Sequence, residues 1–103
     1  MTTVTVKRLA QGKRREFYTS QTLAATARRM MAEGCYEVEG TLSVDQLTGA
    51  DAAEEVFDLT NNPSRTEECE ERYLLRSVTV GDILTVDGVD FLCAPIGWEK
   101  ISS

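Results

Sequence analysis

Residues 76–93 decide the fold, and they read Arg76-Ser77-Val78-Thr79-Val80-Gly81-Asp82-Ile83-Leu84-Thr85-Val86-Asp87-Gly88-Val89-Asp90-Phe91-Leu92-Cys93. Asp87-Gly88 lies between two apolar-rich runs and is typical of a two-residue type I′ hairpin turn, because both residues tolerate positive φ. The turn predicts apolar pairs on one face and a polar pair on the other: Val86–Val89 and Leu84–Phe91, then Thr85–Asp90. The rest of the chain must cover the apolar face of this hairpin.

Alternation of apolar and polar residues predicts further strands upstream of the hairpin. Residues 2–10 alternate with one buried face, and residues 35–44 alternate with a bulge expected at Gly40. Between them, residues 14–18 are predicted to form a short second strand that pairs back on the first, on the β propensity of its two aromatic residues.

A last strand is predicted over residues 94–101. Pro95 and Gly97 interrupt its pattern, so we expect it to be kinked or to lie at an edge of the sheet. Trp98 and Ile101 are expected to pack back on the core.

Two helices complete the predicted elements. The first has a cap at Thr19 or Ser20, ends at Gly34, and carries an apolar stripe: Leu23, Ala27, Met30 and Met31. The second opens on a capping box, Thr48-Gly49-Ala50-Asp51, and stops at Asn61-Asn62-Pro63. Its buried stripe consists of Ala53, Val56, Phe57 and Thr60. Together the elements predict a small α+β fold, with a mostly antiparallel sheet of about five strands and two helices packed on one face.

Length and composition predict one α+β domain, residues 1–103, because the chain is too short for two separate cores. No apolar run is long enough to span a bilayer, and no signal-peptide pattern begins the chain. Three widely spaced cysteines are typical of free thiols in a reducing compartment. We therefore expect a cytoplasmic protein without a membrane partner, located in the host bacterial cytoplasm if it is phage-encoded.

Charge is distributed unevenly along the chain, whose net charge is −6. Seven basic residues and one acidic residue precede Met30, whereas four basic and sixteen acidic residues follow from there. The basic segment Lys7–Arg15, next to Tyr18, is a candidate nucleic-acid contact, comprising Lys7, Arg8, Lys13, Arg14, Arg15 and Tyr18. The alternative is a solvated segment whose charges pair with the acidic residues further along the chain.

A second candidate surface is acidic. It combines four glutamates around Cys69 with the single tryptophan, and its residues are Glu67, Glu68, Glu70, Glu71 and Trp98. Such a surface is suited to docking on a basic protein or to mimicking nucleic acid. The alternative is an exposed, solvated loop.

The sequence favours a protein that is not an enzyme. It contains no histidine, which removes the commonest general base and metal ligand. It has no Cys-x-x-Cys pair, no P-loop and no dinucleotide fingerprint, and its cysteines are expected to be buried or, for Cys69, poorly nucleophilic. We predict no catalytic residue, no metal site and no cofactor, although a carboxylate-only site stays open as a third reading.

From Ala53 to Ile101 the order of motifs resembles the YodL-like domains of phages, plasmids and conjugative elements. The matching motifs are Val56-Phe57-Asp58-Leu59-Thr60-Asn61, Arg76–Ile83, Phe91-Leu92-Cys93 and Ile96-Gly97-Trp98-Glu99-Lys100-Ile101. The acidic segment 64–72 departs from the family pattern, which has a shorter link there. The resemblance implies a phage or mobile-element origin and no established activity, and turn chemistry alone also accounts for residues 77–82.

The sequence therefore predicts a small phage- or mobile-element-encoded accessory protein that binds a host or phage protein without catalysis. Regulation, defence evasion and host takeover are all compatible with it. The alternative function is nucleic-acid binding through the segment Lys7–Arg15. The oligomeric state and the strand order are left open.

Overall fold

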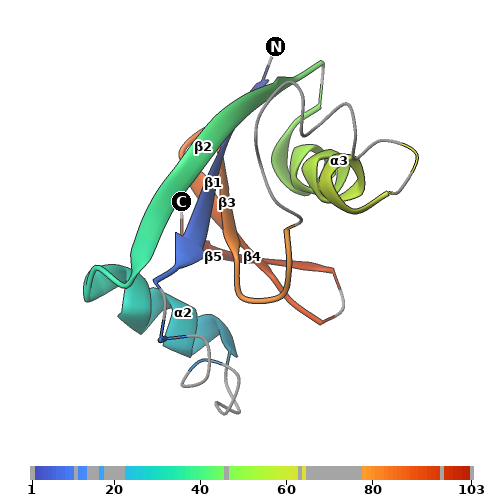
Figure 1. The fold of residues 1–103 in the computed structure, drawn as a ribbon. Helices are drawn as coiled ribbons and strands as arrows, with labels where there is room; N and C mark the ends of the chain where they lie inside the picture. Colours follow the sequence, from blue (N-terminus) through green and yellow to red (C-terminus); the bar gives the residue numbers. More distant parts are fainter. Residues whose placement is uncertain are drawn as a thin grey trace.

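A computed structural model of the chain describes residues 2–10, 12–13, 17, 23–45, 47–62, 64, 78–95 and 97–102. The elements are β1 (Thr2–Leu9), α2 (Leu23–Ala32), β2 (Tyr36–Val44), α3 (Gly49–Asn61), β3 (Ile83–Val86), β4 (Val89–Cys93) and β5 (Trp98–Ser102). The strands form one antiparallel sheet in the order β2-β1-β3-β4-β5 (Figure 1). The predicted fold class, a small α+β domain with a five-stranded antiparallel sheet and two helices, is confirmed.

The β3–β4 hairpin has the predicted turn and register. Asp87 and Gly88 have φ of 51° and 80°, as a type I′ turn requires. The Cα partners are those that the sequence predicts: Val86–Val89, Thr85–Asp90 and Leu84–Phe91. Asp87-Gly88 therefore sets the register of β3 against β4.

Buried side chains form two clusters, one on each face of the sheet. The cluster under α3 contains Val4, Val6, Leu42, Val44, Ala52, Ala53, Val56, Leu59, Val78, Leu84, Val86, Phe91 and Cys93. The cluster under α2 contains Leu9, Phe17, Ala27, Met30, Cys35, Ile83, Leu92 and Ile101. The central strands are therefore covered on both sides.

The two helices lie on opposite faces of the sheet, which differs from the predicted packing on one face. Ile83 belongs to the α2 cluster and its neighbour Leu84 to the α3 cluster. Adjacent residues of a strand point to opposite faces, so the helices that contact them cannot share a face. In Figure 1, α3 lies to the right of the sheet and α2 at its lower left end. The physical reason is that Ile83-Leu84 and Phe91-Leu92 are apolar on both faces, as in fully covered strands.

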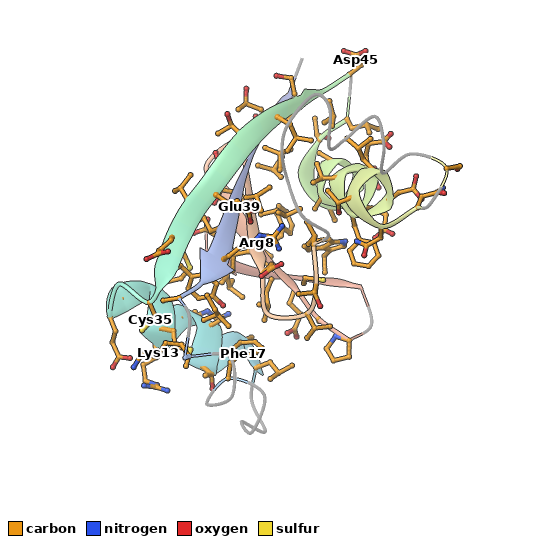
Figure 2. The ribbon with its side chains drawn as sticks, in the orientation of Figure 1. Arg8, Lys13, Phe17, Cys35, Glu39 and Asp45 are labelled. Atoms are coloured by element: carbon orange, nitrogen blue, oxygen red, sulfur yellow. The ribbon has the colours of Figure 1, made fainter. Side chains whose placement is uncertain are left out.

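The predicted bulge in β2 is confirmed. Val6 pairs with Gly40 and Lys7 pairs with Val38, so Glu39 is the extra residue of β2. A bulge turns the side chain of the extra residue out of the regular alternation. Here Glu39 lies beside Arg8 of β1 (Figure 2).

The predicted second strand, residues 14–18, is wrong at Phe17, its one described residue. The Phe17 N–H donates to the carbonyl of Lys13 at 3.1 Å, a helical contact four residues apart. Its ring is fully buried in the α2 cluster. A Cβ added to Gly81, which has φ of 99°, would lie 3.2 Å from this ring, so Gly81 permits the close contact.

A glycine with positive φ lies at one end of each helix. The predicted apolar stripe of α2 packs on its cluster, and Gly34 has the left-handed φ of 76° expected beyond the helix end. Helix α3 begins after Thr48 as predicted, but the Thr48 side chain makes no cap hydrogen bond, so the capping box is wrong. The chain enters α3 through Gly49 at φ +55°, rather than through the helical first turn that a capping box needs.

The last strand, β5, lies at the edge of the sheet as expected. Ile101 is buried, and Trp98 is half-buried against the α3 cluster. None of the described helices is both long and apolar enough to cross a membrane.

Candidate functional site

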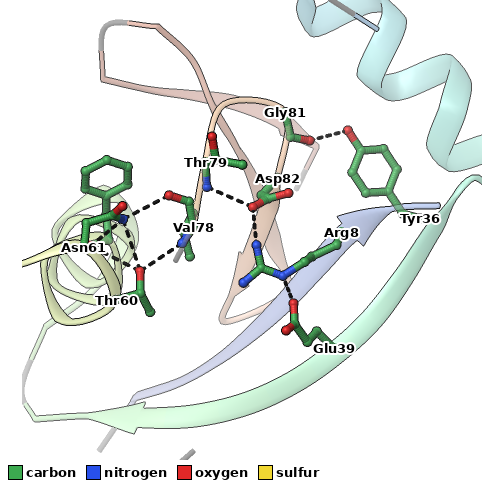
Figure 3. A network of polar contacts seen from close by, with 10 residues as sticks. Arg8, Tyr36, Glu39, Thr60, Asn61, Val78, Thr79, Gly81 and Asp82 are labelled. Carbon is green, nitrogen blue, oxygen red and sulfur yellow. Dashed lines mark hydrogen bonds and ion pairs between the residues drawn. The ribbon is translucent and has the colours of Figure 1, made fainter. Parts of the chain in front are cut away.

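A buried polar network surrounds Asp82, in the turn that leads into β3 (Figure 3). Its carboxylate is fully buried and accepts hydrogen bonds from Arg8 Nη1 at 2.6 Å and from the Thr79 N–H at 2.9 Å. Its backbone carbonyl accepts from the N–H of Cys93 at 2.9 Å. Asp82 therefore joins β1, β4 and its own turn.

Arg8 crosses from β1 to reach two carboxylates. Its guanidinium forms ion pairs with Asp82 and with the bulged residue Glu39 (Figure 3). The Arg8 side chain is 8% exposed. A buried charge of this kind is tolerated because it is paired, and removing one partner is strongly destabilising.

Two residues at the end of α3 hold the segment that precedes this turn. Thr60 Oγ1 accepts the N–H of Val78 at 3.0 Å, and Asn61 Nδ2 donates to the carbonyl of Val78 at 2.9 Å. Asn61 Nδ2 also donates to the carbonyl of Phe57 at 2.9 Å, at the end of its own helix. Both backbone groups of Val78 are therefore satisfied by side chains.

A fourth element, β2, fixes the turn from the other side of the sheet. The hydroxyl of Tyr36, at the start of β2, donates to the carbonyl of Gly81 at 2.6 Å (Figure 3). The turn 78–82 is thus held by β1, β2, β4 and α3. The Val78 backbone, the Gly81 carbonyl and the Asp82 carboxylate are bonded to the chain itself, so the chemistry of this network is that of a structural clamp.

An open cavity of about 190 Å³ lies near the same end of β4 as Asp82, beside the β4–β5 turn. The described residues that line it are Glu54, Phe57, Cys93, Ala94, Pro95, Gly97 and Trp98. Phe57 and Trp98 meet edge to face, with ring centroids 6.2 Å apart at 84°. The exposed carboxylate of Glu54 accepts the Trp98 indole N–H at 2.9 Å. Two aromatic rings and one carboxylate therefore surround an accessible space.

The thiol that lines this cavity is not a nucleophile at neutral pH. Cys93 is buried, and burial raises the pKa of its thiol to about 11, with smaller effects from the charges of Asp82 and Glu54. Because the thiolate is the reactive form, a neutral thiol is inert. Cys35 is also a buried free thiol, so the expectation for these two cysteines is confirmed, while Cys69 lies outside the described residues.

The predicted basic segment is not gathered on one surface in its described part. Arg8 is buried in the Asp82 network, and Lys7 Nζ lies 3.5 Å from the Asp90 carboxylate on the other face of the sheet. Lys13 is exposed near the α2 end of the molecule (Figure 2). Arg14, Arg15 and Tyr18 lie outside the described residues. The alternation of β1 could have predicted that Arg8 is buried. Arg8 lies two residues after Val6, so it faces the same cluster under α3.

Of the predicted acidic surface, only Trp98 is described, and it lines the cavity. Its glutamates, Glu67, Glu68, Glu70 and Glu71, lie outside the described residues. Sequence reasoning missed Glu54 and Phe57 as neighbours of Trp98. The signal was their spacing of three on α3, which places them on adjacent positions of one helix surface.

Over the described ranges, no three His, Cys, Asp or Glu side chains are grouped so as to hold a metal ion. Comparison with known proteins gives no match, since no family model, curated protein or solved structure is sufficiently similar to the chain. The resemblance to the YodL-like domains therefore stays a prediction.

Proposed function

We propose that this protein acts without catalysis, by binding another protein through the cavity beside Trp98. The observation that carries the proposal is the contrast between the cavity and the rest of the described polar groups. The Asp82 carboxylate and the Arg8 guanidinium are buried and bonded to other groups of the fold. Phe57, Trp98 and Glu54 instead meet at an accessible space.

The composition of the cavity supports a protein ligand. Tryptophan and other aromatic side chains are enriched at the centres of protein interfaces, where they contribute most of the binding energy. Pro95 and Gly97 are exposed on the rim, so the surface around Trp98 is accessible. The resemblance to the YodL-like domains implies that this binding serves an accessory role for a phage or mobile element.

The experiment is affinity capture with the tagged protein from bacterial lysate, with and without nuclease. A nuclease-resistant, stoichiometric partner that is lost with Pro95→Ser or Glu54→Ala supports the proposal. Val38→Ala is the matched control, because Val38 is 62% exposed on β2, at the far edge of the sheet. Recovery that disappears with nuclease favours the alternative, nucleic-acid binding by the segment Lys7–Arg15. A partner retained by both cavity variants contradicts the role of the cavity.

A further inference from the structure

The cavity beside Trp98 has the size of a site for one side chain. Pockets for small-molecule ligands enclose roughly 300–1,000 Å³. The volume here is about 190 Å³, and the cavity is open to solvent at the β4–β5 turn. A protruding residue of a bound protein matches this space better than a free metabolite does.

The walls of the cavity are suited to a cation. The faces of Trp and Phe rings attract cations through their quadrupole, and Trp attracts them most strongly. Trp98 and Phe57 provide these rings, and Glu54 provides the only carboxylate among the described residues of the wall. No lysine or arginine is present among the described residues that line the cavity.

Glu54 is held in place for such a contact. One of its oxygens, Oε2, accepts the Trp98 indole N–H, which fixes the carboxylate beside the ring. Within the described part of the chain, its other oxygen, Oε1, forms no hydrogen bond. A guanidinium presents several N–H donors in one plane and also stacks on aromatic rings, so it can contact Oε1 and a ring face together.

The electrostatic surroundings favour the same ligand. The chain has a net charge of −6. At the floor of the cavity, the charges of Asp82 and Glu54 add to burial in raising the pKa of the Cys93 thiol. A positive side chain is therefore attracted to this site, and a negative one is repelled.

We propose that the cavity formed by Glu54, Phe57 and Trp98 binds an arginine side chain of a partner protein. This inference rests on the proposed function and gives it a chemical partner: a basic segment whose arginine enters the cavity. The guanidinium would stack on Trp98 and donate to Oε1 of Glu54.

Trp98 is the only tryptophan of the chain, so its fluorescence reports directly on the cavity. The probe is the tripeptide Gly-Arg-Gly, acetylated and amidated, titrated to about 10 mM because one exposed cation contact supports only weak affinity. The control probe replaces arginine with citrulline, which has nearly the same shape and no charge. We expect a saturable change in fluorescence with the arginine probe and at least tenfold weaker binding of the citrulline probe.

Variants identify the residue that recognises the charge. Glu54→Gln keeps an acceptor for the indole but loses the charge, and we expect roughly threefold to fivefold weaker binding of the arginine probe. Glu99→Gln is the matched control, because Glu99 is exposed and adjacent to Trp98 but alternates to the other side of β5. Binding by Glu99→Gln should equal that of the wild type, and circular dichroism checks that both variants are folded.

Equal affinity for the two probes overturns the inference, as does full affinity of Glu54→Gln or no fluorescence change with arginine. These results differ from a failure of the proposed function. A captured partner that depends on the cavity, with no arginine binding, leaves protein binding in place and refutes only the arginine. Arginine binding without any captured protein refutes the function and supports the site.

Discussion

Two carboxylates near the same end of β4 have opposite roles. Asp82 is fully buried and bonded to Arg8 and to the backbone of Thr79. Glu54 is exposed and, among the residues that the structure describes, is bonded only to the Trp98 indole. Cys93 lies between them, since its N–H donates to Asp82 and its side chain lines the cavity beside Glu54.

The difference separates a carboxylate that stabilises the fold from one that stays accessible at the surface. A buried carboxylate requires complete pairing, which leaves it no capacity for a ligand. An exposed carboxylate contributes little to stability and is available to bind. Burial and bonding, rather than residue type, therefore identify the group that a partner can reach.

The largest effect is expected from Asp82→Asn. The change leaves the Arg8 guanidinium buried with one carboxylate fewer, so the free energy of unfolding should fall by about 3 kcal/mol. Urea unfolding followed by circular dichroism measures it. Asp87→Asn is the control, because Asp87 is exposed and Asn also tolerates its φ of 51°, and its unfolding should change by less than about 0.5 kcal/mol. Similar losses in the two variants would refute the structural role of Asp82.

The hairpin could be predicted from sequence because its determinants are local. Asp87-Gly88 sets the turn, and the turn sets the pairing of the residues next to it. The bulge at Gly40 and the helix end at Gly34 are similarly local. The resemblance to the YodL-like domains is not needed for any of these features.

The Asp82 network could not be predicted, because its partners are far apart along the chain. Arg8 and Asp82 are separated by 74 residues, and turn chemistry alone is a sufficient reason for an aspartate after Gly81. The local sequence instead predicts a basic surface that includes Arg8. Its alternation with Val6 points to the core, but alternation does not indicate which acid pairs with it.

Which face of the sheet each helix covers, and where the cavity forms, both depend on the whole sheet. One apolar face of the hairpin was predicted, yet Ile83 and Leu92 make the opposite face apolar as well. That second face is the site of α2. The cavity needs Glu54 of α3 beside Trp98 of β5, and this proximity follows only from the sheet order.

Gly81→Ala should produce the next largest effect and tests how tightly the Asp82 turn is packed. An added Cβ meets both an unfavourable φ of 99° and the Phe17 ring at 3.2 Å. The free energy of unfolding should fall by about 2 to 3 kcal/mol. Gly88→Ala is the control, because its φ of 80° is also positive but no atom lies within 4 Å of an added Cβ. Its loss should be about 1 kcal/mol, and an equal loss in both variants would show that crowding at Gly81 is unimportant.

Cys93 connects the two regions and predicts a pH dependence. Its folded-state pKa, about 11, is above the ordinary value of 9.0, so the folded protein holds this proton more tightly than the unfolded chain. Stability is unaffected well below pH 9 and decreases as the pH rises from about 9 to 11. The decrease should be on the order of 2 kcal/mol. Urea unfolding at pH 8 and at about pH 10.5 measures it, with Cys93→Ala as the control for other groups that titrate. Equal pH dependence in both proteins would contradict the burial of this thiol.

Glu54→Gln should have the smallest effect on folding. The side chain is exposed and its bond to the indole needs only an acceptor oxygen, which glutamine retains. The free energy of unfolding should change by less than about 0.5 kcal/mol, whereas the same chemical change at Asp82 costs several times more. Paired urea titrations of the two amide variants make this comparison directly. A large loss in Glu54→Gln would mean that the cavity carboxylate also holds the fold. Its weaker binding of an arginine probe could then no longer be separated from a change in stability.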